Sequence, residues 1–159
     1  MKNRITSAVA VYVVLMNDHD EVLLALRANT GYQDGVWQTP AGHVETGELP
    51  TEATIREALE EVGIRLTKLD LKLIHISARP QHDETGNRID LFFHITHWDG
   101  EVRNMEPGKC AELRWCKLSE LPENMTPHVR TGITKGLAGE LYSEFTLEQM
   151  HKLPIYGLT

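Results

Sequence analysis

Three glutamates, Glu57, Glu60 and Glu61, lie close together in a segment with the periodicity of a helix. Apolar residues recur there at the i, i+3, i+4 and i+7 positions, so we expect the glutamates on one face and, on the other, a core stripe of Ile55, Ala58, Leu59 and Val62. Like charges one turn apart and the helix dipole both disfavour such a cluster near a helix C-terminus. Hard oxygen ligands gathered in this way suit Mg²⁺ or Mn²⁺. The pattern therefore predicts a divalent metal site.

Arg56 is the one basic residue on this stretch. It stands one turn from Glu52 and one turn from Glu60, so we expect it to pair with those two carboxylates and to leave Glu57 and Glu61 without a cation. The competing interpretation is a solvated polar face, but a helix built only for solubility would carry lysines in its last turn. A metal ion near Glu57 and Glu61 would supply the missing positive charge.

The flanking sequence predicts the elements that position this helix. Pro50 suits a first helical position and Gly63 a helix end, which predicts a helix from about Pro50 to Val62. A helical pattern returns from Pro127 to about Phe145, with a short helix in the tail from Thr146. The stretch 29–51 is rich in glycine and proline, which predicts a long loop with two short strands. Runs rich in β-branched residues predict strands at Ser7–Leu15, Glu21–Arg27, Leu71–Ser77, Ile89–Trp98 and Leu113–Lys117, with a tight turn at Asp99-Gly100 leading toward Val102.

Length and composition limit the classes of protein. The chain has 159 residues, 41% hydrophobic and 25% charged, which is typical of one globular domain, and we expect a single domain over residues 1–159. No apolar run is long enough to span a membrane, so a cytoplasmic location is expected. A net charge of −7 disfavours nucleic-acid polymers as partners. Cys110 and Cys116 fit neither a disulfide framework nor a zinc site, and we expect reduced thiols.

The segment from Gly42 to Ile64, GHVETGELPTEATIREALEEVGI, resembles the 23-residue Nudix box. That motif is Gly, five residues, Glu, seven residues, then Arg-Glu-aliphatic-x-Glu-Glu-x-Gly-aliphatic. Its fixed positions are all met, by Gly42, Glu48, Arg56, Glu57, Glu60, Glu61 and Gly63. The resemblance implies an α/β fold in which a mixed β-sheet is sandwiched between helices (α/β/α).

The resemblance also implies roles for individual residues. Arg56 would orient the glutamates, Glu48 would brace the loop to the helix, and Gly63 would end the helix. Arg27 and Arg79 would hold phosphates or, equally well, form surface salt bridges. His128 would face a base or cap a helix. Divalent ions, one to three in number, would be bound by the Gly42 carbonyl, Glu57, Glu60 and Glu61, with a further carboxylate from Glu106 or Glu112.

The activity implied is metal-assisted attack of water on a phosphoric anhydride, with Glu57 or Glu60 as base and Glu61 as a metal ligand. The run from Glu112 to Val129 resembles the branch that acts on nucleoside triphosphates, releasing nucleoside monophosphate and pyrophosphate. The alternative is cleavage of ADP-ribose or a dinucleoside polyphosphate, and Pro80 resembles a feature of the ADP-ribose-cleaving branch. Members that clean oxidised guanine nucleotides tend to carry an amide or acid where this chain has His128. A non-catalytic nucleotide sensor is a rival of another class, but sensors usually have damaged glutamates. Members are often homodimers, which implies a homodimer here.

Overall fold

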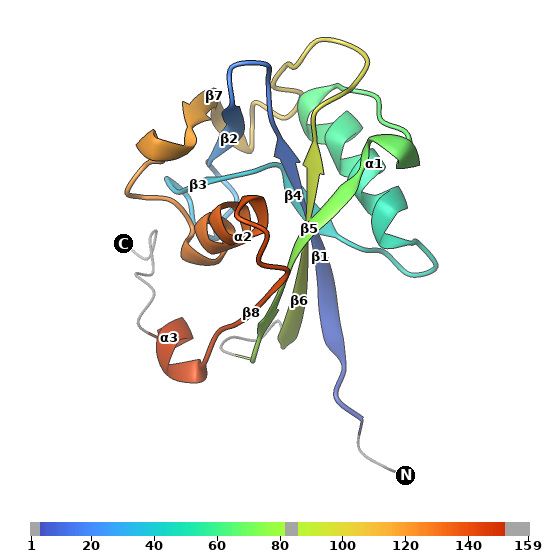
Figure 1. Ribbon diagram of the computed structural model, residues 1–159. Helices are drawn as coiled ribbons and strands as arrows, with labels where there is room; N and C mark the ends of the chain where they lie inside the picture. Colours follow the sequence, from blue (N-terminus) through green and yellow to red (C-terminus); the bar gives the residue numbers. More distant parts are fainter. Residues whose placement is uncertain (1–3, 82–85, 152–159) are drawn as a thin grey trace.

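The computed structural model describes residues 4–81 and 86–151. A five-stranded mixed sheet has the order β4-β1-β6-β5-β8, and a second sheet has the order β3-β2-β7 (Figure 1). Strand β1 is parallel to β6 and antiparallel to β4. The elements in chain order are β1 Ser7–Leu15, β2 Glu21–Arg27, β3 Trp37–Gln38, β4 Ala41–His43, α1 Pro50–Val62, η1 Lys68–Asp70, β5 Lys72–Arg79, β6 Asn87–Ile95, β7 Cys110–Lys117, η2 Leu118–Glu120, α2 Pro127–Leu137, β8 Tyr142–Glu144 and α3 Leu147–His151.

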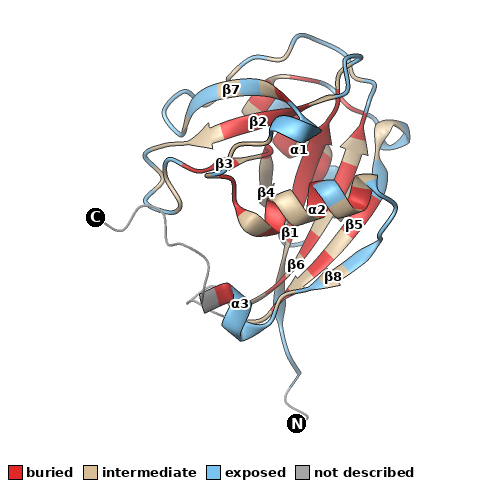
Figure 2. Cartoon of the chain, turned by 60° about the vertical axis from the view of Figure 1, so that its left-hand side comes forward, coloured by how far each residue is buried: buried red, intermediate tan, exposed pale blue. Residues whose placement is uncertain are grey.

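Alternation along β1 explains the layers. Tyr12 and Val14 join a buried cluster with Val129 and Ile133 of α2. Val13, between them, points to the other side and joins the cluster that α1 completes. Because successive side chains of a strand point to opposite faces, the two helices cover opposite faces of the sheet (Figures 1 and 2). The α/β/α sandwich expected from the sequence is confirmed.

Helix α1 begins and ends where its sequence predicts. The Glu52 carboxylate accepts a hydrogen bond from the backbone N–H of Leu49 at 2.9 Å, which satisfies one of the amides left open at a helix start. Gly63 ends the helix with a left-handed φ of 74°. The core stripe was wrong in one position, because Leu59 is 48% exposed while Glu57 is buried.

Helix α2 is shorter than the periodicity suggested. It ends at Leu137, and Gly139 adopts a φ of 89°, which turns the chain back along the sheet. The following residues pair with β5 as the edge strand β8, so the helix expected to run to Phe145 was wrong in its second half. The short helix expected in the tail is present as α3.

The chain after β6 also departs from expectation. Trp98 lies beyond the strand and stacks on Trp115 of β7. Asp99 pairs with Arg65 in an isolated bridge, and the segment 101–109 that follows Gly100 is a loop. This loop returns to the end of α1, where it contributes to the site described below. None of the helices in the described part of the chain is long and apolar enough to cross a membrane.

Candidate active site

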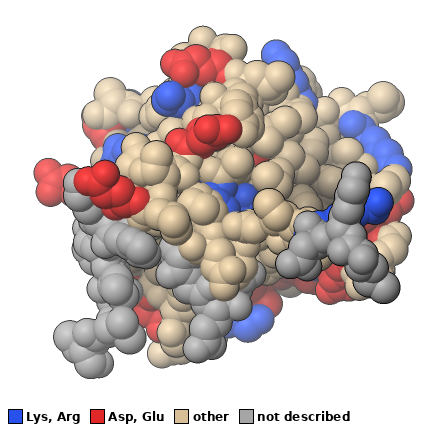
Figure 3. All heavy atoms as spheres, turned by 90° about the horizontal axis from the view of Figure 1, so that it is seen from below, with Lys and Arg blue, Asp and Glu red and all other residues tan. Residues whose placement is uncertain are grey.

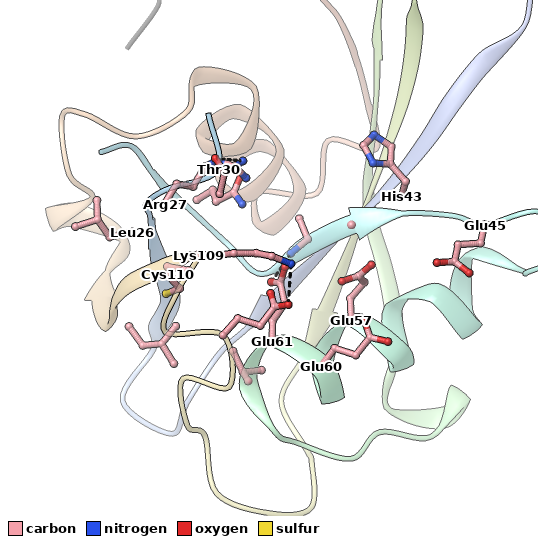
Figure 4. A pocket seen from close by; sticks show the side chains of 17 residues that line it. Leu26, Arg27, Thr30, His43, Glu45, Glu57, Glu60, Glu61, Lys109 and Cys110 are labelled. Atoms are coloured by element: carbon pink, nitrogen blue, oxygen red, sulfur yellow. Dashed lines mark hydrogen bonds and ion pairs between the residues drawn. The ribbon is translucent and has the colours of Figure 1, made fainter. Parts of the chain in front are cut away.

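A cavity of about 480 Å³ opens beside the C-terminal half of α1 (Figure 4). Glu57, Glu60 and Glu61 line it from α1, and Glu106 and Lys109 line it from the loop before β7. Gly42 of β4 and Arg27 of β2 lie in the same lining. The structure therefore brings together most of the residues that the sequence marks for metal and phosphate binding.

Glycine at position 42 lets β4 pass close to α1. A Cβ atom added to Gly42 would overlap the carboxylate of Glu57. Glu57 is itself buried, and this burial raises the pKa of its carboxyl despite the neighbouring arginine. The close packing of β4 against α1 therefore requires glycine at position 42, because the Glu57 carboxylate occupies the space that a side chain would fill.

Arg56 holds the loop, the helix and the strand together. Its Nε donates to Glu48 at 2.8 Å, and its two terminal nitrogens donate to Glu57 at 2.7 Å and to the His43 carbonyl at 3.0 Å. A longer bond of 3.3 Å reaches Glu60. The pKa of Arg56 is raised, mainly by its hydrogen bonds to Glu48, so the guanidinium stays charged.

The partners expected for Arg56 were therefore partly wrong. It pairs with Glu60 as expected, but its second main partner is Glu48 from the loop, and Glu57 does have a cation. Glu52 instead lies 3.6 Å from Lys68. A loop that closes over the helix brings Glu48 into reach, which helical spacing alone does not reveal.

Glu61 is the carboxylate that Arg56 does not reach. Burial, followed by the charge of Glu57, raises the pKa of Glu61 to about 8. Its carboxylate accepts a hydrogen bond from the backbone N–H of Ala41 at 3.1 Å. A carboxyl in this environment is neutral or lacks a counter-charge, so a cation entering the cavity would be bound favourably.

The loop before β7 is fastened to the end of α1 through its backbone. The N–H of Met105 donates to the Glu61 carbonyl at 3.0 Å, and the N–H of Arg103 donates to the Val62 carbonyl at 3.0 Å. This places Glu106 beside Glu61, and Lys109 forms an ion pair with Glu106 at 3.1 Å. Glu112 is exposed, pairs with Arg114 and lies outside the cavity lining, so the geometry favours Glu106 as the additional carboxylate.

The donor set fits a hard divalent ion. Carboxylates from α1 and the loop face one cavity, and oxygen ligands of this kind suit Mg²⁺ or Mn²⁺. Within residues 4–81 and 86–151, no three His, Cys, Asp or Glu side chains already form a closed metal cage. Mg²⁺ does not require one, because it usually keeps several waters and is bound by one or two carboxylates together with substrate phosphates.

The three candidate substrate residues have different surroundings. Arg27 lines the cavity and is held by the Tyr32 carbonyl at 2.9 Å and the Thr30 hydroxyl at 3.0 Å. His128 is buried in the first turn of α2 and lines a second cavity. Arg79 is 2% exposed and forms a bidentate ion pair with Asp90, so it is neither a surface salt bridge nor part of either cavity lining.

Comparison with known proteins decides the family. The sequence model of the NUDIX domain matches residues 6–135. This chain belongs to the Nudix family. It is 34% identical to an 8-oxo-dGTP diphosphatase of Proteus vulgaris over 61% of this chain and 82% of that protein. It is 32% identical to an ADP-ribose pyrophosphatase of Methanocaldococcus jannaschii, over 76% and 68% of the two chains.

Solved structures agree with this assignment. A MutT NUDIX hydrolase from Burkholderia pseudomallei has a TM-score of 0.73 and 25% identity, covering 81% of this chain and 97% of that chain. The chain also matches the NAD-capped RNA hydrolase NudC of Pseudomonas aeruginosa, but spans only 36% of its length. With a complete box, this Nudix protein is an enzyme that hydrolyses phosphoric anhydride bonds, and such enzymes generally need a divalent metal.

Several cavity residues of this Nudix enzyme were not singled out individually from the sequence. Lys109, Thr30 and Gln38 line the cavity, yet none belongs to the box or to a periodic pattern. They reach the site because β2 pairs with β3, which carries Gln38, and with β7, which Lys109 directly precedes. His43, which follows Gly42 directly, is the one that its position in the motif could have revealed.

Proposed function

We propose that this Nudix hydrolase converts a nucleoside triphosphate or deoxynucleoside triphosphate to the monophosphate and pyrophosphate. One observation carries the proposal: the acidic cavity continues into a second cavity that has none of its glutamates. The two share Arg27, Gln38, Ala41, Gly42 and His43, so one extended molecule can occupy both. A phosphate chain would lie at the glutamates and a nucleoside in the second cavity.

The charged residues at the phosphate end would have different roles. A bound Mg²⁺ or Mn²⁺ would polarise phosphate oxygens and make its bound water more acidic. Glu61 and Glu106 would hold the ion, and Arg56 keeps the Glu57 carboxylate in place. The buried Glu57, whose pKa is raised, is better suited than the exposed Glu60 to take a proton from the attacking water. Arg27 would bind a phosphate oxygen.

Cleavage of ADP-ribose is the second candidate. It is favoured by the similarity to the ADP-ribose pyrophosphatase of Methanocaldococcus jannaschii and by the lining residues that the two cavities share, since two adjoining cavities could take a second sugar. A non-catalytic sensor has no support, because the three box glutamates are intact and face the cavity. A single domain, a homodimer and a cytoplasmic location stay predictions from the sequence.

Product analysis separates these candidates. The purified protein is incubated with nucleoside triphosphates, ADP-ribose or dinucleoside polyphosphates, in Mg²⁺, Mn²⁺ or EDTA, and products are resolved by chromatography. We expect monophosphate and pyrophosphate in equal amounts from a triphosphate, with metal only. AMP and ribose phosphate from ADP-ribose, without turnover of any triphosphate, would contradict the proposed substrate but would still agree with hydrolysis of a phosphoric anhydride bond.

A further inference from the structure

Strand β7 lies at the edge of its sheet and has one side open for pairing. It is the outer strand of the order β3-β2-β7, and in the described part of the chain no strand pairs with its other side. Its register on β2 is unbroken from Lys117 to Glu112 and shifts only beyond Glu112. Ala111, Glu112, Arg114 and Lys117 are exposed (Figure 2). A long, regular and open edge of this kind can accept a strand from another chain.

The hydrogen bonds of β2 show which backbone groups of β7 face the open side. Arg27 uses its N–H, and Glu21 its C=O, for bonds on the side of β2 away from β7. Backbone groups of an antiparallel strand face alternate sides, so Leu24 bonds toward β7, where it lies opposite Arg114. The N–H and C=O of the next residue, Leu113, therefore face outward. No other described residue hydrogen-bonds to them.

Two opposite charges flank Leu113 on one face of the strand. The guanidinium carbon of Arg114 lies 4.4 Å from the ring centroid of Trp37, and Arg114 is ion-paired with Glu112 at 2.9 Å. Both charged side chains are about half exposed. Charged residues on an edge usually keep other strands away. The order of these two charges has a different consequence for a second copy of the same strand.

Antiparallel pairing of two identical strands about a two-fold axis places one residue opposite itself. With Leu113 at the axis, Glu112 lies opposite Arg114 of the second copy, and Arg114 lies opposite Glu112. An axis one residue away would place Glu112 opposite Glu112, or Arg114 opposite Arg114. Opposite charges directly across a ladder stabilise it, and like charges destabilise it. The charges therefore select the register in which the two outward-facing Leu113 backbones bond to each other.

We propose that two copies of this chain associate through β7, antiparallel about Leu113, so that their three-stranded sheets join into one. The proposal does not depend on the proposed function, because it needs no substrate. It assigns a surface to the homodimer that was expected from the sequence. The interface would adjoin the acidic cavity, whose lining includes Lys109, Cys110 and Leu113.

Sedimentation velocity of the purified protein, at concentrations up to about 1 mM, tests the association. We expect a reversible monomer–dimer equilibrium that is weaker in about 1 M salt, because the charges are exposed. Glu112→Arg and Arg114→Glu each turn both cross-strand pairs into like-charge pairs, so each should raise the dissociation constant at least about tenfold. The matched control, Glu101→Arg, breaks an exposed Glu–Arg pair of the same spacing in a loop, with Arg103, and should leave the constant unchanged.

Mixing the two variants separates contact between copies from the ion pair within one chain. In the mixture each Arg of one variant faces a Glu of the other, so Glu112→Arg and Arg114→Glu should associate with each other more tightly than either does with itself. Loss of the ion pair within one chain cannot produce this result, because both variants lack it. Circular dichroism confirms that each variant is folded.

A backbone variant guards against misfolding of Arg114→Glu, which loses the contact with Trp37. Leu113→Pro removes an N–H that faces the second copy and none that bonds to β2, and proline is tolerated at such edge positions. It should also raise the dissociation constant at least about tenfold. A monomer at every concentration would overturn the proposal. A dimer whose dissociation constant is unchanged by Glu112→Arg and by Leu113→Pro would overturn it too, as would folded charge variants that do not associate when mixed.

Discussion

Replacing Glu61 with glutamine removes a charge at nearly constant side-chain shape. The substitution therefore makes it possible to measure, in the metal-free protein, how much the Glu61 charge lowers the free energy of unfolding. The pKa of Glu61 rises from an ordinary 4.5 to about 8, because the carboxyl is buried beside Glu57. Between these two pH values the folded protein holds a proton that the unfolded chain has lost, so metal-free stability must fall as pH rises. The loss begins near pH 4.5 and is complete near pH 8.

The magnitude follows from the size of the shift. Each pKa unit corresponds to about 1.4 kcal/mol, which puts the upper limit near 5 kcal/mol. Although the carboxyl itself is buried, Glu61 as a residue is half-buried and lines an open cavity, and screening by water there reduces the expected loss to about 2–3 kcal/mol. Glutamine cannot ionise, so Glu61→Gln should not lose this stability as pH rises and should be the more stable protein at pH 8.

Urea unfolding in EDTA at pH 5, 6.5 and 8, followed by circular dichroism, measures the effect. The control, Glu120→Gln, removes an exposed carboxylate outside the cavity and should keep the pH dependence of the unchanged protein. Mg²⁺ should restore the stability of the unchanged protein at pH 8 and do little for Glu61→Gln. Equal dependence on pH in the unchanged protein and Glu61→Gln would refute the assignment of a buried, unneutralised carboxyl.

Three other substitutions test separate parts of the structure. Gly42→Ala should displace the Glu57 carboxylate and lower kcat by about a hundredfold, measured as initial rates, while circular dichroism shows the fold retained. Gly132→Ala should force a methyl group into the ring of Phe92 and cost about 1–3 kcal/mol in urea unfolding; an unchanged midpoint would contradict the packing. Lys109→Met removes a cation that competes for the glutamates and should tighten Mn²⁺ binding by up to about fivefold in a spectroscopic titration, whereas weaker binding would contradict that role.

Local patterns predicted the helix that carries the chemistry. The bounds of α1 follow from Pro50 and Gly63, and the spacing of the glutamates places them on the helix next to the cavity. The same local reasoning failed for Leu59, because which flank of a helix is covered depends on what packs there. It failed again after Leu137, where pairing of β8 with β5 outweighs the helical periodicity.

The remaining parts of the site depend on contacts between distant segments. The choice between Glu106 and Glu112 could not be made from spacing, because it depends on backbone hydrogen bonds that hold the preceding loop to the end of α1. The resemblance implied that Arg79 holds a phosphate or forms a surface salt bridge, yet the register of β5 on β6 places it in a buried ion pair with Asp90. The acidic cavity and its neighbour appear only when β1, β2, β4 and β7 are assembled.

Mixed charge on the surface fits a small substrate. Acidic and basic side chains are interspersed on the face seen in Figure 3, and its described residues form no broad basic surface of the kind that binds nucleic-acid polymers. This agrees with the net charge of −7 and with an anion that is bound through a metal ion.

The most direct test of the central claim measures nucleoside monophosphate release from a triphosphate by the unchanged protein, Glu61→Gln and Glu120→Gln, each in Mg²⁺ and in EDTA. We predict equal amounts of monophosphate and pyrophosphate from the unchanged protein and Glu120→Gln in Mg²⁺, none in EDTA, and a rate at least about a hundredfold lower for Glu61→Gln. Turnover in EDTA, or a normal rate for Glu61→Gln, would contradict a metal-dependent hydrolase built on the carboxylates of α1.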